Sequence, residues 1–65
     1  MEAEAYIGLY KSGIHDMRFL KFKKHRYLVI DNTEKRAAWF KTRLEAHTQW
    51  EIWRNEILVN QLHSM

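Results

Sequence analysis

The segment from Arg18 to Arg26 has the most concentrated charge in the sequence. It contains five basic residues and no acidic residue, and aromatic residues lie between and beside them. Basic side chains can neutralise phosphates while neighbouring aromatic rings stack on bases, a combination typical of nucleic-acid binding. The alternative is a solvated strand face whose lysines discourage pairing with other sheets. The candidate nucleic-acid-binding residues are Arg18, Lys21, Lys23, Lys24, Arg26 and Tyr27, with Phe19 as a further stacking platform.

The three tryptophans lie in the C-terminal half at a spacing typical of one helix face. Trp39, Ala46, Trp50, Trp53 and Ile57 are separated by 7, 4, 3 and 4 residues, a heptad-like pattern. Tryptophan is favoured at the centres of protein interfaces, so this tryptophan stripe predicts docking to a protein partner or to a second copy of the chain. An apolar stripe is also typical of a domain core, and the sequence leaves this alternative open. The predicted partner-binding residues are Trp39, Arg43, Ala46, Trp50, Trp53 and Ile57.

The sequence contains no pattern that indicates catalysis or metal binding. The chain has no cysteine, and His15, His25, His47 and His63 are not spaced as metal ligands. It has no Gly-rich phosphate loop and no G-x-S-x-G motif. We therefore expect a protein that is not an enzyme and that binds no cofactor or metal.

Length and composition indicate one small domain over residues 1–65. A chain of 65 residues buries only about 60% of its unfolded surface, so a monomer should be marginally stable and oligomerisation would help. The net charge is +3. No apolar run reaches the roughly 18 residues of a membrane span, and the first residues are acidic, unlike a secretory signal. The absence of cysteine is compatible with the cytoplasm, where we expect the protein.

The elements that position these residues are predicted from periodicity and composition. Alternating apolar residues predict a strand over Ala3–Lys11, and aromatic and β-branched residues predict strands over Met17–Lys23 and Arg26–Asp31. The turn between the second and third strands is a poor tight turn, because it contains no Gly, Asn or Asp. The alternative is a short helix over Asp16–His25.

The C-terminal half predicts one long helix over residues 32–62, because it contains no Gly or Pro and ends in periodic apolar residues. Asp31 with Glu34 resembles a capping box, and Thr33 is an alternative N-cap. A break near His47 is the alternative to a continuous helix. Apart from the tryptophan stripe, a second apolar group falls on roughly the opposite side of this predicted helix and would need another surface to cover it. Its members are Ala37, Phe40, Leu44, Leu58 and Leu62.

The sequence therefore predicts an α+β fold: a small antiparallel sheet of two to three strands within residues 3–31, packed by one long C-terminal helix. The leading functional hypothesis is a regulatory or adaptor protein that acts by docking or self-association through the tryptophan stripe, and its size suits a phage or mobile-element protein. The alternative is a small basic DNA- or RNA-binding protein. Membrane-surface attachment is disfavoured by the four glutamates of the predicted helix.

Overall fold

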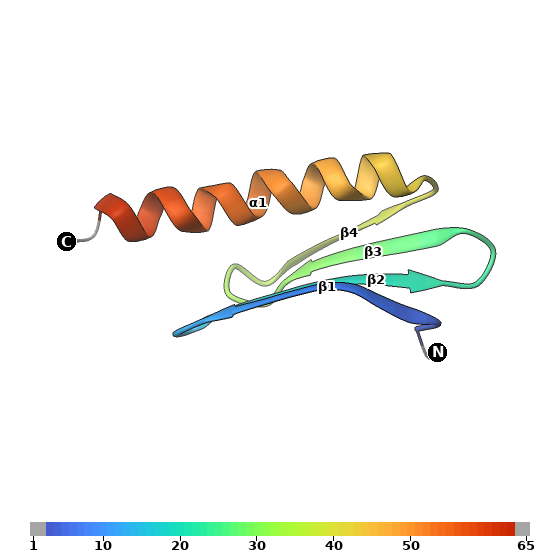
Figure 1. Cartoon of the computed structure of the whole chain (residues 1–65), viewed down its shortest axis with the longest axis horizontal. Helices are drawn as coiled ribbons and strands as arrows, with labels where there is room; N and C mark the ends of the chain where they lie inside the picture. Colours follow the sequence, from blue (N-terminus) through green and yellow to red (C-terminus); the bar gives the residue numbers. More distant parts are fainter. Residues whose placement is uncertain (1–2, 64–65) are drawn as a thin grey trace.

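A computed structural model describes residues 3–63, with side chains through Asn60. The chain forms an antiparallel sheet followed by one helix that lies along it (Figure 1). The strand order in the sheet is the order in the sequence, so each strand pairs with the next. The fold is α+β as the sequence predicts, but the sheet has four strands rather than two to three. The elements are β1 (Ala5–Ser12), β2 (His15–Phe22), β3 (Arg26–Asp31), β4 (Arg36–Phe40) and α1 (Arg43–His63).

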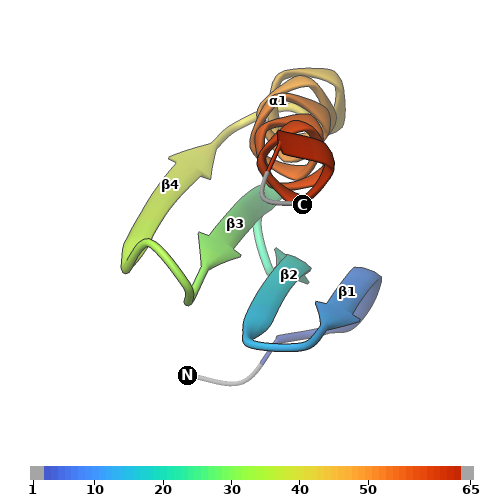
Figure 2. The same cartoon turned by 90° about the vertical axis from the view of Figure 1, so that its left-hand side faces the viewer.

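The three strands predicted before residue 32 are confirmed as β1, β2 and β3, and the alternative of a short helix over Asp16–His25 is wrong. In an extended chain successive side chains point to opposite faces, so one face of the sheet is packed under α1 and the other is left without a covering helix (Figure 2). The core lies between α1 and the first of these faces. Its buried members are Met17, Phe19, Tyr27 and Val29 from the sheet and Ala46, Trp50 and Ile57 from the helix.

Trp50 packs closely against the sheet because the β1 residue beneath its indole is Gly8, which has no side chain. A Cβ atom added to Gly8 would lie 3.2 Å from Cζ2 of the Trp50 indole, closer than ordinary van der Waals contact. The strand also shifts register between Tyr6 and Gly8, which places Gly8 opposite Phe19. The centroids of the Phe19 and Trp50 rings are 5.9 Å apart. Gly8 therefore provides the space that this aromatic contact needs.

β4 occupies residues that the sequence predicts to be helical. The cause is Asp31, whose side chain is completely buried. Its Oδ1 accepts hydrogen bonds from the backbone N–H groups of Thr33 (3.1 Å) and Glu34 (3.3 Å). Asp and Asn favour both helix N-caps and turns of this kind, because the side-chain oxygen can satisfy nearby backbone donors in either structure. Here Asp31 starts a turn that leads into β4, so the predicted helix over residues 32–42 is wrong.

The helix begins instead at Arg43, with Thr42 as its N-cap. The Thr42 hydroxyl accepts a hydrogen bond from the backbone N–H of Glu45 (3.3 Å) and donates one to Oε1 of Glu45 (2.7 Å). This is the T-x-x-E form of a capping sequence. From Arg43 the helix continues past His47 without a break, as the continuous-helix prediction requires.

Arg36 joins β4 to both the preceding turn and α1. Its Nε donates to Asp31 (3.0 Å) and its Nη2 to Glu56 on the helix (2.6 Å). Its guanidinium carbon lies 4.6 Å from the centroid of the Trp53 ring, within cation–π range. Burial alone would lower the pKa of Arg36, but the hydrogen bonds and charges of Glu56 and Asp31 outweigh it and raise the pKa above its usual value. Arg36 therefore stays charged and fixes the helix over β4.

Candidate nucleic-acid interface

The predicted tryptophan stripe is divided between the core and the surface. Ala46, Trp50 and Ile57 are 0%, 7% and 3% exposed beneath the helix, and Trp53 packs half-buried against them. Trp39 lies on β4, outside the helix, and is 54% exposed. The stripe is therefore not one continuous helix face. In this fold Ala46, Trp50 and Ile57 are core residues without access to a partner, which supports the core alternative for them.

Five of the eleven basic residues lie at one end of the molecule. The turn between β2 and β3 and the connection from β4 to α1 lie at the same end of the sheet (Figure 1). Residues 41 and 43, which are remote in sequence from the basic segment, are thereby brought to the same end. We call this set the basic end; its members, all exposed, are Lys23, Lys24, Arg26, Lys41 and Arg43.

The charge of the basic end is not neutralised within the part of the chain that the structure describes. None of its five residues takes part in an ion pair there. The acidic residue nearest to it in sequence, Glu45, is hydrogen-bonded to Thr42 at the helix N-terminus. The basic end is therefore a surface of unpaired positive charge, which attracts polyanions.

Two of the predicted basic residues are placed differently. Arg18 is in the middle of β2, where its Nε lies 3.5 Å from Oδ1 of Asp16. Lys21 is on the same strand nearer the basic end, with its Nζ 4.0 Å from a carboxylate oxygen of Glu4. Both cations are already paired with an acid, so neither belongs to the unpaired cluster.

The aromatic rings predicted to stack on bases are in the core. Tyr27 is 9% and Phe19 1% exposed, and their rings meet edge to face at 6.4 Å beneath α1. The ring exposed near the basic end is Trp39, whose centroid is 5.1 Å from that of Phe22. Trp39 and Phe22 lie on the sheet face away from the helix, and Phe22 is only 7% exposed. The stacking platform is therefore Trp39, supported from behind by Phe22.

An open pocket connects this ring to the basic end. It is lined by Arg26, Trp39, Phe40 and Lys41 and has a volume of about 320 Å³. This is near the lower limit of small-molecule pockets, which suits a single flat ring rather than a large ligand. The pocket combines an aromatic surface with two cations, the groups that bind a base and its phosphate.

The β2–β3 turn forms despite its unfavourable sequence. Lys24 and His25 have φ angles of 63° and 53°, in the left-handed region. This conformation costs residues other than glycine roughly 1–2 kcal/mol each. The hairpin tip therefore carries Lys24 and His25 in a conformation that their own side chains do not favour. A turn residue with the same strain, Lys35 (φ 54°), lies at the opposite end of the sheet.

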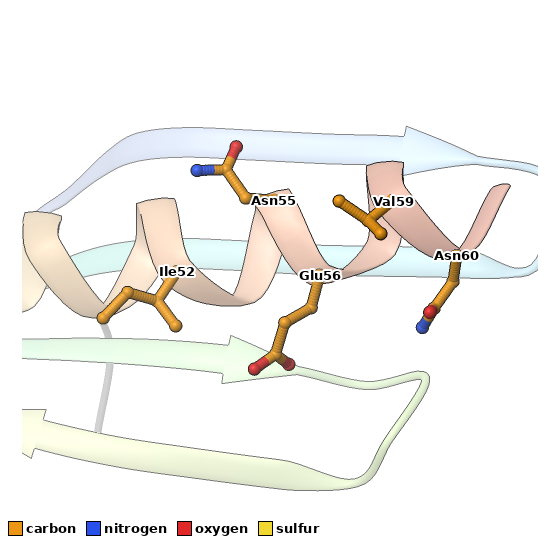
Figure 3. A pocket seen from close by; sticks show the side chains of 5 residues that line it. All are labelled: Ile52, Asn55, Glu56, Val59 and Asn60. Carbon is orange, nitrogen blue, oxygen red and sulfur yellow. The ribbon is translucent and has the colours of Figure 1, made fainter. Parts of the chain in front are cut away.

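A second surface feature is a shallow groove along the side of α1, with Ile52 and Glu56 pointing toward the neighbouring strands (Figure 3); we call it the outer groove. Ile52, Asn55, Glu56 and Val59 stand at positions i, i+3, i+4 and i+7, the spacing of a hole that accepts a side chain from a facing helix. Ile52 and Val59 are about half exposed. The groove lies on the flank of α1 nearest β4, because Glu56 within it binds Arg36, and its residues belong to neither predicted stripe.

The second predicted apolar group is also divided. Ala37 and Phe40 lie on β4, so they share no helix face with the remaining members. Leu44 and Leu58 are exposed on α1, at 76% and 39%. The side chain of Leu62 lies outside the described residues.

Among residues 3–60, no three His, Cys, Asp or Glu side chains converge as a metal site. The side chain of His63 lies outside this range. The described helix is not long and apolar enough to cross a bilayer. Comparison of the chain with protein-family models, curated proteins and solved structures finds no match.

Proposed function

We propose that this is a small non-enzymatic nucleic-acid-binding protein whose basic end contacts the phosphate backbone. The observation that carries the proposal is the convergence of Lys41 and Arg43 with Lys23, Lys24 and Arg26 at one end of the fold. Cations that have no acidic partner among the described residues lose little when they exchange water and counterions for phosphate.

The number of cations predicts the salt dependence of binding. Five phosphate contacts give a slope of log K against log[salt] of about −3.5 for a single strand and about −4.5 for duplex DNA. Affinity should therefore fall by about two orders of magnitude or more between 50 and 200 mM salt.

Fluorescence anisotropy with a labelled oligonucleotide tests the proposal. The double variant Lys23→Gln/Lys24→Gln should reduce the slope on a single strand by about 1.4, because two phosphate contacts are lost. The double variant Lys11→Gln/Lys35→Gln is the matched control: it removes the same charge from exposed residues near the opposite end of the sheet. It should leave the slope close to that of the wild type.

Two results would refute the proposal. One is the absence of binding to DNA or RNA at micromolar protein and about 25 mM salt, where five contacts are strongest. The other is an equal loss of affinity in the two double variants, because the effect would then follow net charge rather than the basic end.

Docking to a protein partner or a second copy is the other candidate function. The accessible surface for it is the outer groove of α1 rather than the tryptophan stripe, because Trp50 is buried. Light scattering across concentration tests self-association. A dimer that dissociates in Ile52→Asp would support this candidate, and a monomer at all concentrations would leave only a foreign partner.

A further inference from the structure

We propose that the ligand is single-stranded, with an unpaired base stacked on Trp39 and the adjoining phosphate held by Arg26 and Lys41. This inference rests on the proposed nucleic-acid binding and specifies its ligand and its central residue. It is carried by the pocket in which those three residues and Phe40 meet.

Trp39 is both accessible and supported, as a stacking platform must be. About half of its surface is exposed, while its other contacts include the buried ring of Phe22 at 5.1 Å and an interplanar angle of 55°. A ring held from one side loses little side-chain entropy when a ligand covers the other. By contrast, Trp50 and Trp53 are covered by the protein's own fold.

The sheet register places cations beside this ring. Tyr27 of β3 pairs with Phe40 of β4, so Arg26 and Lys41 occupy the next positions along the two adjacent chains. Residues opposite each other in an antiparallel pair have Cα atoms about 4.5–5.5 Å apart. Although the ladder ends at Tyr27 and Phe40, Arg26 and Lys41 line the same pocket as Trp39, and two cations in one pocket suit one phosphate group.

The sheet face beyond Trp39 extends the platform. A cross-strand row runs Tyr6, Leu20, Leu28, Trp39, one residue from each strand, on the face opposite α1. Tyr6 is 67% exposed at one edge and Trp39 is 54% exposed at the other. With neighbouring strands about 4.8 Å apart, the backbones of the two edge strands lie roughly 14 Å from each other along this row. A single strand that crosses the sheet can meet both rings.

A duplex does not fit this arrangement. In a double helix the faces of the bases are stacked on one another, so an aromatic side chain cannot lie on them unless a base is flipped out. A sheet face with exposed rings at its edges contacts unpaired bases directly, and such stacking tolerates any sequence. The cations of the basic end then contact the phosphate backbone of the bound single strand.

The experiment compares two ligands that carry equal charge. One is an oligothymidine and the other an abasic oligonucleotide of the same length, which retains every phosphate but has no bases. Each is titrated with the wild type, Trp39→Leu and Trp39→Phe, and a blunt duplex of the same length serves as a third ligand. Circular dichroism and a thermal melt check that each variant is folded.

The wild type should bind oligothymidine more tightly than the abasic chain and the duplex. Trp39→Leu should lose roughly 5- to 150-fold in affinity for oligothymidine, the range expected for one stacked base, with little change for the abasic chain. Its salt slope should equal that of the wild type. Trp39→Phe should restore most of the affinity.

Equal affinity of wild type and Trp39→Leu for oligothymidine would overturn this inference while leaving phosphate binding at the basic end intact. Tighter binding of the duplex than of the single strand would also overturn it. Self-association of the free protein that disappears in Trp39→Leu would show that a second copy covers the ring instead. Failure of every nucleic acid to bind would refute the proposed function itself.

Discussion

Relief of strain in the β2–β3 turn should stabilise the protein and weaken nucleic-acid binding at the same time. Lys24 has φ 63°. A left-handed conformation costs a residue with a Cβ about 1–2 kcal/mol, and glycine removes this cost but adds about 0.5–1 kcal/mol of unfolded-chain entropy. The difference is about 0–1.5 kcal/mol, so Lys24→Gly should raise the free energy of unfolding by about 0.75 kcal/mol at the centre of this range. For a domain of this size, that central value corresponds to an increase in Tm of about 3–6 °C.

The same variant removes one cation from the basic end. One phosphate contact fewer on a single strand reduces the salt slope by about 0.7. If variant and wild type bind equally at 1 M salt, the variant should bind about eightfold more weakly than the wild type at 50 mM salt. The two effects should have opposite signs, because glycine relieves the turn but removes a cation.

Lys35→Gly is the matched control for Lys24→Gly. Lys35 has φ 54° and also occupies a turn between strands, but it lies at the opposite end of the sheet. It should gain similar stability and lose no more than a small part of the affinity. Thermal melts by circular dichroism give the stability, and anisotropy with labelled oligothymidine gives the binding. A decrease in Tm for Lys24→Gly would refute the strain argument, and equal loss of affinity in the two variants would refute the location of the site.

The remaining predictions concern the fold that presents this site. Gly8→Val should destabilise the protein by about 1–3 kcal/mol, because the valine side chain would be forced against the Trp50 indole, and Gly8→Ala should cost less. Equal stability of the two variants in urea unfolding would contradict this contact. Thr42→Ala should cost about 1 kcal/mol through loss of the N-cap, measured as a lower Tm, and an unchanged Tm would argue against the cap. Asp31→Ala should cost about 2–4 kcal/mol, because buried backbone donors and Arg36 lose their acceptor; a well-folded variant with wild-type urea midpoint would contradict this.

The first strand was predictable from its alternating apolar residues, and the next two from their aromatic and β-branched content. The side that packs under the helix was not predictable, because β2 buries Met17 and Phe19 on one face and Leu20 and Phe22 on the other. The turn at Lys24 was not supported by its own residues. It forms because the strands on either side pair and bury enough apolar surface to outweigh its strain.

The start of the helix was mispredicted because aspartate is favoured both at helix N-caps and in turns between strands. Asp31 was interpreted as a helix N-cap, yet it caps a turn, because burial against Arg36 places it at the end of β3. The correct signal was present eleven residues later, where Thr42 and Glu45 form a T-x-x-E sequence. Local patterns alone could not choose between the two, since β4 is only five residues long and Arg36–Phe40 also fits a helix.

The candidate site was predicted only in part for the same reason. The charge of Lys23, Lys24 and Arg26 is evident in the sequence, but Lys41 joins it only because β4 returns to the same end of the sheet. Trp39 was assigned to a helix face, and its position on the sheet depends on the missed strand. Residues that converge through topology cannot be found from spacing along the chain.

The most direct test of the account is a nuclear magnetic resonance titration of the labelled protein with oligothymidine at low salt. The account predicts the largest shifts at residues 23–26, at the Trp39 indole N–H and at residues 41–43, with few changes around the β3–β4 turn. Shifts concentrated on the outer groove of α1 or at residues 32–36, or no shifts at saturating oligonucleotide, would contradict it.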